Sequence, residues 1–148
     1  MSKKILIVGS QGYLGSRLMS YLSNQGNECK GIDTGFFKNG VLTHIVSEDV
    51  EKKDARLIVQ NDLEGYDALI LLAGISNDPF GHMSSAQIYD PTRVYALSIA
   101  SMCKQLNIQF IYPSSCSVYG AAKDEFLSEE STTNPQTPYS INKLQVEN

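Results

Sequence analysis

Residues 5–15 read ILIVGSQGYLG, a run of four apolar side chains followed by three glycines at intervals of three. A short apolar run that ends at a glycine is typical of a strand buried on both faces, as in a parallel sheet. Beyond it, Leu14, Leu18 and Leu22 recur at helical spacing until Gly26, the kind of residue that ends a helix. The stretch therefore predicts a strand that turns through glycines directly into a helix.

The rest of the chain alternates strand and helix patterns around this first unit. Apolar runs predict strands at residues 29–32, 67–74 and 108–112, with a further short strand at 41–46. Helical patterns predict helices at residues 55–63, at 86–106 with Pro91 near its start or at a kink, and from Tyr139 onward. In the long helix we expect the core positions Val94, Leu97, Ile99, Met102 and Cys103. Residues 48–54 are polar and predict neither element.

This order of elements predicts the fold class, a doubly wound α/β protein with a Rossmann-type parallel sheet. Ligands of such sheets bind at the carboxyl ends of the strands. Gly9, Asp33, Ala73 and the pair Ser114-Ser115 all follow predicted strands. We therefore expect the functional residues to gather at one edge of the sheet.

Size and composition are those of one globular domain, with 148 residues, 42% of them apolar and 19% charged. The net charge of −4 argues against nucleic-acid and membrane-surface partners. Cys29, Cys103 and Cys116 are too widely spaced for a zinc site or a disulfide framework, so we expect reduced thiols, no metal and a cytoplasmic protein. The apolar run at residues 5–8 is too short for a signal peptide or a membrane span.

Gly9, Gly12 and Gly15 form a G-x-x-G-x-x-G pattern between the first strand and the first helix. In dinucleotide sites the first glycine makes the tight turn, the second lets a pyrophosphate approach the backbone, and the third lets the helix pack against the strand. The positive end of the helix dipole then faces the phosphates. The spacing differs from G-x-G-x-x-G, and glycines also cluster by chance, but the flanking strand and helix favour a dinucleotide site.

Asp33 lies 18 residues after Gly15, at the end of the second predicted strand. A carboxylate there accepts hydrogen bonds from both hydroxyls of an adenosine ribose and repels a 2′-phosphate. The loop that follows carries Lys38 and no arginine, so we expect NAD in preference to NADP. The alternative is an aspartate that only starts a turn. Asp54 and Ala55 could approach an adenine edge, although aspartate is common at any element boundary.

Tyr139 and Lys143 stand four residues apart in the last predicted helix. Residues i and i+4 share one face of a helix, so the ammonium would lie beside the phenol ring. A fixed positive neighbour favours phenolate and lowers a tyrosine pKa from its usual value of about 10, which would suit proton transfer near neutrality. The alternative is a partly buried tyrosine next to a solvated lysine.

Residues 114–117 read SSCS and follow a predicted buried strand. A serine hydroxyl here could bind a substrate hydroxyl next to Tyr139, and a polar turn is the alternative. A serine hydrolase lacks support because there is no G-x-S-x-G motif and because His44 and His82 stand in ordinary contexts. Cys116 would be reactive only with a lowered pKa.

Several motifs occur in a fixed order along the chain: VGSQGYLG at residues 8–15, Asp33, LAG at 72–74, SSCSVYG at 114–120, Glu130, PYSINK at 138–143 and Glu147. The ordered set resembles the extended short-chain dehydrogenase/reductase family, and most closely its NAD-dependent sugar-nucleotide epimerases and dehydratases. Each motif is weak alone, and the specificity lies in their order and spacing.

The resemblance implies a set of cofactor contacts and catalytic roles. NAD would meet Gly9, Gln11, Gly12, Tyr13, Leu14 and Gly15 at its pyrophosphate, Asp33 at its adenosine ribose, Asp54 and Ala55 at its adenine, and Leu72, Ala73, Gly74 and Ser76 on its nicotinamide side. Tyr139 would be the catalytic base, Lys143 would hold the nicotinamide ribose and lower the tyrosine pKa, and Ser115 would be the catalytic serine.

The same resemblance implies epimerisation of a nucleotide sugar. Tyr139 would take a proton from a sugar hydroxyl while hydride passes to NAD, and hydride would return to the other face of the keto-sugar. Cys116 and Ser117 stand where the dehydratases carry an Asp-Glu pair, which argues against a dehydratase. Thr92 stands where an asparagine is usual. The alternatives are an NAD(P)H-dependent reductase of the same family and a non-catalytic dinucleotide-binding regulator.

Members of this family continue well beyond the helix that carries Tyr139, into a smaller substrate domain. We therefore expect residues 1–148 to be an incomplete NAD-binding Rossmann domain that stops before the substrate domain and is inactive alone. In the full-length protein we expect a homodimer through a helix bundle that includes residues 86–106 and the helix from Tyr139.

Overall fold

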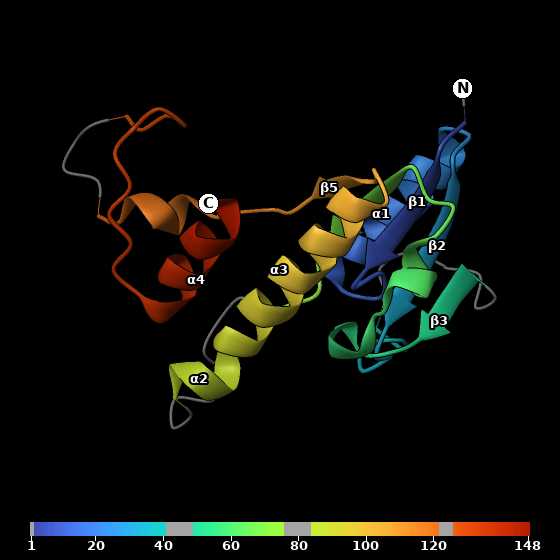
Figure 1. Ribbon diagram of the computed structural model, residues 1–148, viewed down its shortest axis with the longest axis horizontal. Helices are drawn as coiled ribbons and strands as arrows, with labels where there is room; N and C mark the ends of the chain where they lie inside the picture. Colours follow the sequence, from blue (N-terminus) through green and yellow to red (C-terminus); the bar gives the residue numbers. More distant parts are fainter. Residues whose placement is uncertain (1, 41–48, 76–83, 122–125) are drawn as a thin grey trace. The chain divides into compact units, whose positions relative to one another are not determined.

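The structure is a computed structural model that describes residues 2–40, 49–75, 84–121 and 126–148 (Figure 1). The short strand predicted at 41–46 and the cofactor contact predicted for Ser76 lie outside the described residues, as do His44 and His82. The chain divides into two compact units. The sheet unit comprises Met1–Gly74 and Leu97–Tyr112, and the α4 unit comprises Ile75–Ala96 and Pro113–Asn148.

The described part of the sheet unit forms a five-stranded parallel sheet in the order β3-β2-β1-β4-β5. The strands are β1 (Lys4–Val8), β2 (Glu28–Asp33), β3 (Val50–Lys52), β4 (Ala68–Leu71) and β5 (Gln109–Ile111). Val8, at the end of β1, pairs with Ile32 on one side and with Leu71 on the other. The carboxyl ends of the three central strands therefore meet at one edge, which confirms the predicted Rossmann-type sheet.

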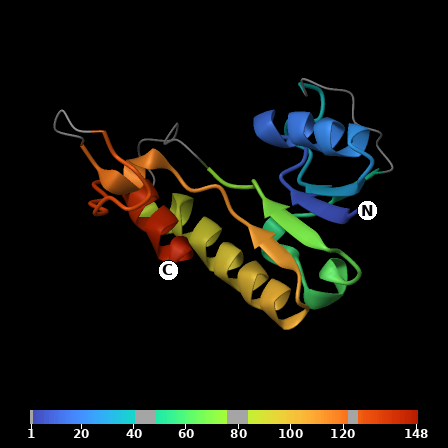
Figure 2. The same cartoon turned by 90° about the horizontal axis from the view of Figure 1, so that it is seen from above.

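Burial of both faces explains why β1 and β4 were readable as unbroken apolar runs. All four residues of β4 are buried, and Ile7 of β1 has no exposed surface. Helix α1 (Tyr13–Asn24) packs Leu18, Met19 and Leu22 against a cluster that includes Ile7. In Figure 2, α1 covers one face of the sheet and the C-terminal part of α3 (Asp90–Gln105) covers the other.

Residues 55–63 do not form the predicted helix. They form two short 3-10 helices, η2 (Ala55–Leu57) and η3 (Gln60–Leu63), separated by extended backbone at Ile58 and Val59. The β-branched side chains at this break disfavour helical backbone. In turn, β3 comes from the polar segment at 48–54, whose one apolar residue, Val50, is half-buried and packs on the core.

The helical pattern at 86–106 divides into α2 (Ser85–Ile88) and α3. Pro91 lies in the first turn of α3, where a residue needs no N–H for the helix. Of the two predicted places for Pro91, the helix start and a kink, the structure shows the helix start. Of the expected core positions, Ile99 and Cys103 are buried, but Val94 and Leu97 are exposed and were wrong. Ala96 takes the buried position instead, because residues 96, 99 and 103 share one helix face.

The α4 unit carries a 3-10 helix, η4 (Cys116–Tyr119), and the helix α4 (Pro138–Glu147). The Thr137 hydroxyl accepts a hydrogen bond from the Ser140 N–H at 3.2 Å and caps α4, and Pro138 occupies its first turn. Helix α4 therefore begins where the sequence predicted. Among the described residues, no helix is both long enough and apolar enough to cross a membrane.

Candidate functional site

The glycine turn joins β1 to α1, and two of its glycines are demanded by the chain itself. Gly9 has a φ of +90°, and a Cβ built there would lie 2.5 Å from the Ala73 nitrogen. A Cβ at Gly15 would lie 2.1 Å from the Gly9 oxygen. The predicted roles of Gly9 in the tight turn and of Gly15 in helix packing are confirmed.

Gly12 is different, because the chain constrains it less tightly than it constrains Gly9 and Gly15. Its φ of −76° is open to any residue, and the nearest atom to a Cβ would be the Gly9 oxygen at 3.3 Å. Gly12 is also the N-cap of α1, where it offers no side chain to the free N–H groups, and no acidic residue lies in the first turn. Those groups and the positive end of the helix dipole leave a place for an anion.

Asp33 ends β2 and fastens the glycine turn. One carboxylate oxygen accepts a hydrogen bond from the Gln11 N–H at 2.8 Å, and the other accepts one from the Gly35 N–H at 2.8 Å. Each oxygen keeps a second lone pair for a further donor such as a ribose hydroxyl. The contact with Gln11 was missed from the sequence, because nothing in a linear pattern shows which backbone N–H a carboxylate meets.

Asp54 lies after β3 and forms an ion pair with Arg56. Its carboxylate accepts hydrogen bonds from the Arg56 side chain at 2.6 and 2.9 Å and from the Arg56 N–H at 2.9 Å. These bonds hold the pKa of the Asp54 carboxyl below its usual range. Ala55 opens η2 beside it and is half-buried. Asp54 is therefore the N-cap of η2, and the predicted adenine contact of Asp54 and Ala55 stays a prediction.

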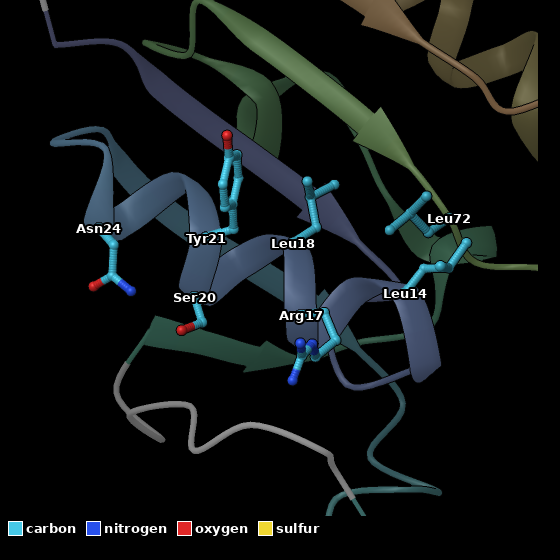
Figure 3. A pocket seen from close by; sticks show the side chains of 7 residues that line it. All are labelled: Leu14, Arg17, Leu18, Ser20, Tyr21, Asn24 and Leu72. Atoms are coloured by element: carbon cyan, nitrogen blue, oxygen red, sulfur yellow. The ribbon is translucent and has the colours of Figure 1, made fainter.

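Leu72, Ala73 and Gly74 continue β4 past its last paired residue. The N–H groups of Leu72 and Ala73 both donate to the Val8 oxygen, at 2.8 and 2.9 Å. Ala73 therefore lies directly against Gly9. Both residues were predicted to lie at the carboxyl edge of the sheet. A groove of about 590 Å³ lies between α1 and the residue that follows β4 (Figure 3). Its lining residues are Leu14, Arg17, Leu18, Ser20, Tyr21, Asn24 and Leu72.

In the α4 unit, Tyr139 and Lys143 form the predicted pair. The Lys143 ammonium lies 5.6 Å from the centroid of the Tyr139 ring and donates a hydrogen bond to the Pro113 oxygen at 2.8 Å. Burial lowers the pKa of Lys143 from its ordinary value of 10.5, while Glu147 acts in the opposite direction. The lysine is thus held between the tyrosine ring and the chain that follows β5.

Ser115 caps η4, which packs against α4. Its hydroxyl oxygen accepts hydrogen bonds from the Ser117 hydroxyl at 2.9 Å and from the Ser117 N–H at 3.3 Å. Both bonds use acceptor positions, so the Ser115 proton is available to a further acceptor. Its neighbour Ser114 bonds to Glu147 and so also ties this segment to α4.

A row of contacts joins residues 139, 142 and 145 of α4 to residues 89–93 at the start of α3, and it was missed from the sequence because it links positions that are far apart in the chain. The three contacts, which we call the α3–α4 ladder, are Tyr89 with Tyr139, Asp90 with Asn142, and Arg93 with Gln145. The ladder and the contacts of Lys143 and Glu147 hold α4 on two of its faces.

The other reactive side chains contribute less. Burial raises the pKa of the Cys103 thiol to about 11 and also raises that of Cys29, whereas Cys116 is exposed. Within the described ranges, no group of three or more His, Cys, Asp or Glu side chains could hold a metal ion.

A family model described as the NAD dependent epimerase/dehydratase family matches residues 5–148. The chain is 26% identical to a UDP-glucose 4-epimerase of Lactobacillus helveticus over 97% of its own length and 45% of that protein. The chain therefore spans about half the length of the relatives it matches.

Two solved structures have a closely similar fold. The NAD-dependent NDP-hexosamine 5,6-dehydratase TunA superposes with a TM-score of 0.85 at 22% identity, over 97% of this chain and 48% of that one. The UDP-glucuronic acid 4-epimerase of Bacillus cereus, solved with NAD and UDP-4-deoxy-4-fluoro-glucuronic acid, gives 0.83 at 26% identity, over 97% and 50%. These similarities confirm the Rossmann-type fold class and the resemblance drawn from the motifs.

Proposed function

The chain belongs to the NAD-dependent epimerase/dehydratase family, and we propose that it forms the NAD-binding part of a sugar-nucleotide epimerase. The observation that carries this proposal is the pair of Tyr139 and Lys143, with the ammonium 5.6 Å from the ring centroid. A phenol held beside a fixed cation is suited to exchange a proton with a sugar hydroxyl. The similarity to a UDP-glucose 4-epimerase supports the substrate class.

The described residues fit NAD at two points. Gly12 and the uncapped N-terminus of α1 leave room and charge for a pyrophosphate, and Asp33 keeps acceptor capacity for a ribose. We assign the pyrophosphate to the turn from Gly9 to Gly15, with Gln11, Tyr13 and Leu14 around it. We assign the adenine to Asp54 and Ala55, and the nicotinamide side to Leu72, Ala73, Gly74 and Ser76, with Tyr139 and Lys143. When bound, NAD supplies reversible hydride acceptance.

In this proposal, Tyr139, Lys143 and Ser115 carry out the proton transfer that accompanies hydride transfer. Tyr139 accepts the proton of the sugar hydroxyl as the carbon beneath it becomes a ketone, and returns it when the carbon is reduced again. The Lys143 ammonium stabilises negative charge on the phenolate oxygen. Ser115 donates its hydroxyl hydrogen to the same sugar oxygen, because its own acceptor positions are taken by Ser117. After the keto-sugar has rotated in the site, its carbonyl carbon is reduced on the opposite face, which inverts the configuration of that carbon.

An observation on η4 favours epimerisation over dehydration. Elimination of water requires an acid and a base near the sugar, and related dehydratases place two carboxylates directly after the catalytic hydroxyl. Cys116 and Ser117 occupy those positions here, and the Ser117 hydroxyl is engaged by Ser115. A reductase that consumes NAD(P)H is the second candidate, and it differs from the epimerase in net cofactor turnover.

Replacement of Tyr139 by phenylalanine in the complete protein that contains this chain tests the proposal. We expect turnover of a UDP-sugar to fall at least about a hundredfold, because general acid–base catalysis contributes that much or more. Tyr21→Phe removes the same hydroxyl from an exposed side chain of α1 and is the matched control. Unchanged turnover in Tyr139→Phe would show that Tyr139 is not the base. Steady oxidation of NADH on addition of a keto-sugar would favour the reductase.

The proposal also covers the cellular compartment and the oligomeric state of the complete protein. Cys29, Cys103 and Cys116 are all free thiols, which suits the cytoplasm. Val94 on α3 is 61% exposed and Ile141 on α4 is 42% exposed, so both could pack against a second copy. We propose a homodimer of the complete protein with a nucleotide sugar as its substrate.

A further inference from the structure

Asn142 is the central contact of the α3–α4 ladder and is unexpected at its position. It lies in the middle of α4 and is only 8% exposed. Asparagine has a low helix propensity, and a buried amide is costly unless its hydrogen bonds are made. Among the described residues, moreover, its side-chain oxygen has no hydrogen-bond partner. An apolar side chain would therefore be the more stable choice unless the amide has a specific task.

The amide nitrogen shows what that task is. It donates one hydrogen bond to an Asp90 carboxylate oxygen at 3.1 Å and another to the Pro138 oxygen at 2.9 Å. The second bond stays within α4, whereas the first crosses to α3. Asp90 is held in turn by Arg93, whose guanidinium lies 3.8 Å from the same oxygen. Asn142 thus joins α4 to a carboxylate that is itself fixed.

The position of Asn142 in α4 makes this bond relevant to Tyr139 and Lys143. Tyr139 lies one turn before it on the same helix face, and Lys143 is the next residue. The neighbouring contact of the ladder packs the Tyr139 ring edge-on against Tyr89, with centroids 5.9 Å apart. Rotation of α4 about its axis would break the bond to Asp90 and would turn the phenol and the ammonium together.

We propose that Asn142 is a positioning residue, which, through Asp90, fixes the rotation of α4 and hence the direction in which Tyr139 and Lys143 point. This inference rests on the proposed function only for its effect on turnover. A displacement of about 1 Å in a catalytic group can cost about a hundredfold in rate, so the bond is worth more to catalysis than to stability.

The test uses single, double and swapped variants in the complete protein. We expect Asn142→Ala and Asp90→Ala each to lower kcat about ten- to hundredfold while KM for the UDP-sugar changes less than about threefold. The double alanine variant should lose no more than either single one, because one bond is removed in all three. Hydrogen exchange of the α4 backbone should become faster in each.

Exchanging the two side chains tests whether the hydrogen bond between positions 90 and 142 matters, as distinct from the identity of either residue. Asn142→Asp alone sets two carboxylates against each other and should lower kcat at least as much as Asn142→Ala. Asp90→Asn combined with Asn142→Asp reverses donor and acceptor across the two helices and should recover kcat at least about fivefold over Asn142→Asp alone, together with slower exchange of α4. Recovery to the parental value is not expected, because an aspartate at position 142 cannot donate the bond that Asn142 gives to the Pro138 oxygen. Both swap substitutions are isosteric, so this arm decides the question even where an alanine variant does not fold.

The outcomes distinguish this inference from the proposed function. Parental kcat in Asn142→Ala, multiplicative losses in the double alanine variant, or a swap variant that is no faster than Asn142→Asp alone would each overturn it. Asn61→Ala removes an exposed amide from η3 and should leave kcat and exchange unchanged. A parent protein without turnover would instead contradict the proposed function, and α4 exchange would still decide whether Asn142 anchors the helix.

Discussion

Asp33 holds two backbone N–H groups, those of Gln11 and Gly35, each at 2.8 Å. It therefore shapes the glycine turn as well as the place where a ribose would bind. Its removal should weaken NAD binding through both effects.

We expect Asp33→Ala to raise the dissociation constant of NAD about ten- to hundredfold, since hydrogen bonds to a charged group are worth about 1.5–3 kcal/mol. Isothermal titration calorimetry measures this directly. Asp67→Ala is the matched control, because Asp67 also accepts a backbone N–H, that of Lys4 at 2.7 Å, but at the amino ends of the strands. Equal affinity in the parent and in Asp33→Ala would contradict the assignment.

Lys143 makes a prediction about pH. Its pKa is lowered by burial, so its charge disappears as the pH rises through a value below 10.5. We expect the alkaline limb of the kcat profile to begin below pH 10.5, and to be absent from the remaining activity of Lys143→Arg, whose guanidinium stays charged. The folded state also binds fewer protons than the unfolded state in that interval, so the unfolding free energy should rise with pH there. Identical alkaline limbs in parent and variant would refute this role.

Single residues were predictable where a motif dictates them and not where three-dimensional contacts do. Gly9, Gly15 and the pair of Tyr139 and Lys143 follow from spacing alone, and their geometry is as expected. The capture of Asp54 by Arg56 depends on a side-chain conformation that no spacing specifies. The same is true of the bond between Asn142 and Asp90, which joins residues that are 52 positions apart.

At the scale of elements, Gly12 and Gly15 of the glycine turn should separate stability from binding. A Cβ at Gly15 would lie 2.1 Å from the Gly9 oxygen and would force α1 away from the turn, whereas a Cβ at Gly12 would lie 3.3 Å from that oxygen. We expect Gly15→Ala to lower the unfolding free energy by about 1–3 kcal/mol. Gly12→Ala should cost less, about 0.5–1 kcal/mol, because alanine is a poorer N-cap than glycine.

NAD affinity should show the opposite sensitivity at Gly12. Gly12→Ala places a methyl group where the pyrophosphate would approach, so we expect at least a tenfold rise in the dissociation constant although the protein loses less stability than Gly15→Ala does. Calorimetric binding and thermal denaturation of the two variants provide the comparison. If Gly12→Ala binds NAD with parental affinity, the pyrophosphate does not approach the backbone at Gly12 and the assignment is wrong.

Elements were predictable in proportion to how completely they are buried. The strands β1 and β4 and the start of α4 were found because unbroken apolar runs and a proline at a helix start are local signals. The segment at 55–63 failed because its apolar residues fit a helix period while its β-branched residues prefer extended backbone. Val94 and Leu97 failed because apolar residues also lie on exposed helix faces.

For the whole molecule, the exposed apolar residues of α3 and α4 predict association. We expect Val94→Glu to convert a dimer of the complete protein into a monomer, because a carboxylate would be buried at the interface. Leu57→Glu, at a 65% exposed position on η2, is the control that should leave the dimer intact. Light scattering coupled to size exclusion gives the mass of each. A parent that is monomeric, or a Val94→Glu protein that remains a dimer, would contradict the proposed interface.

The central claim is that hydride leaves the sugar and returns to it within one turnover. The direct measurement uses a nucleotide sugar that carries deuterium on the carbon whose configuration changes, with mass spectrometry of the product after turnover in ordinary water. The account predicts that the product retains the deuterium at that carbon and that no NADH accumulates. Loss of the deuterium to solvent, or formation of NADH in proportion to product, would contradict it.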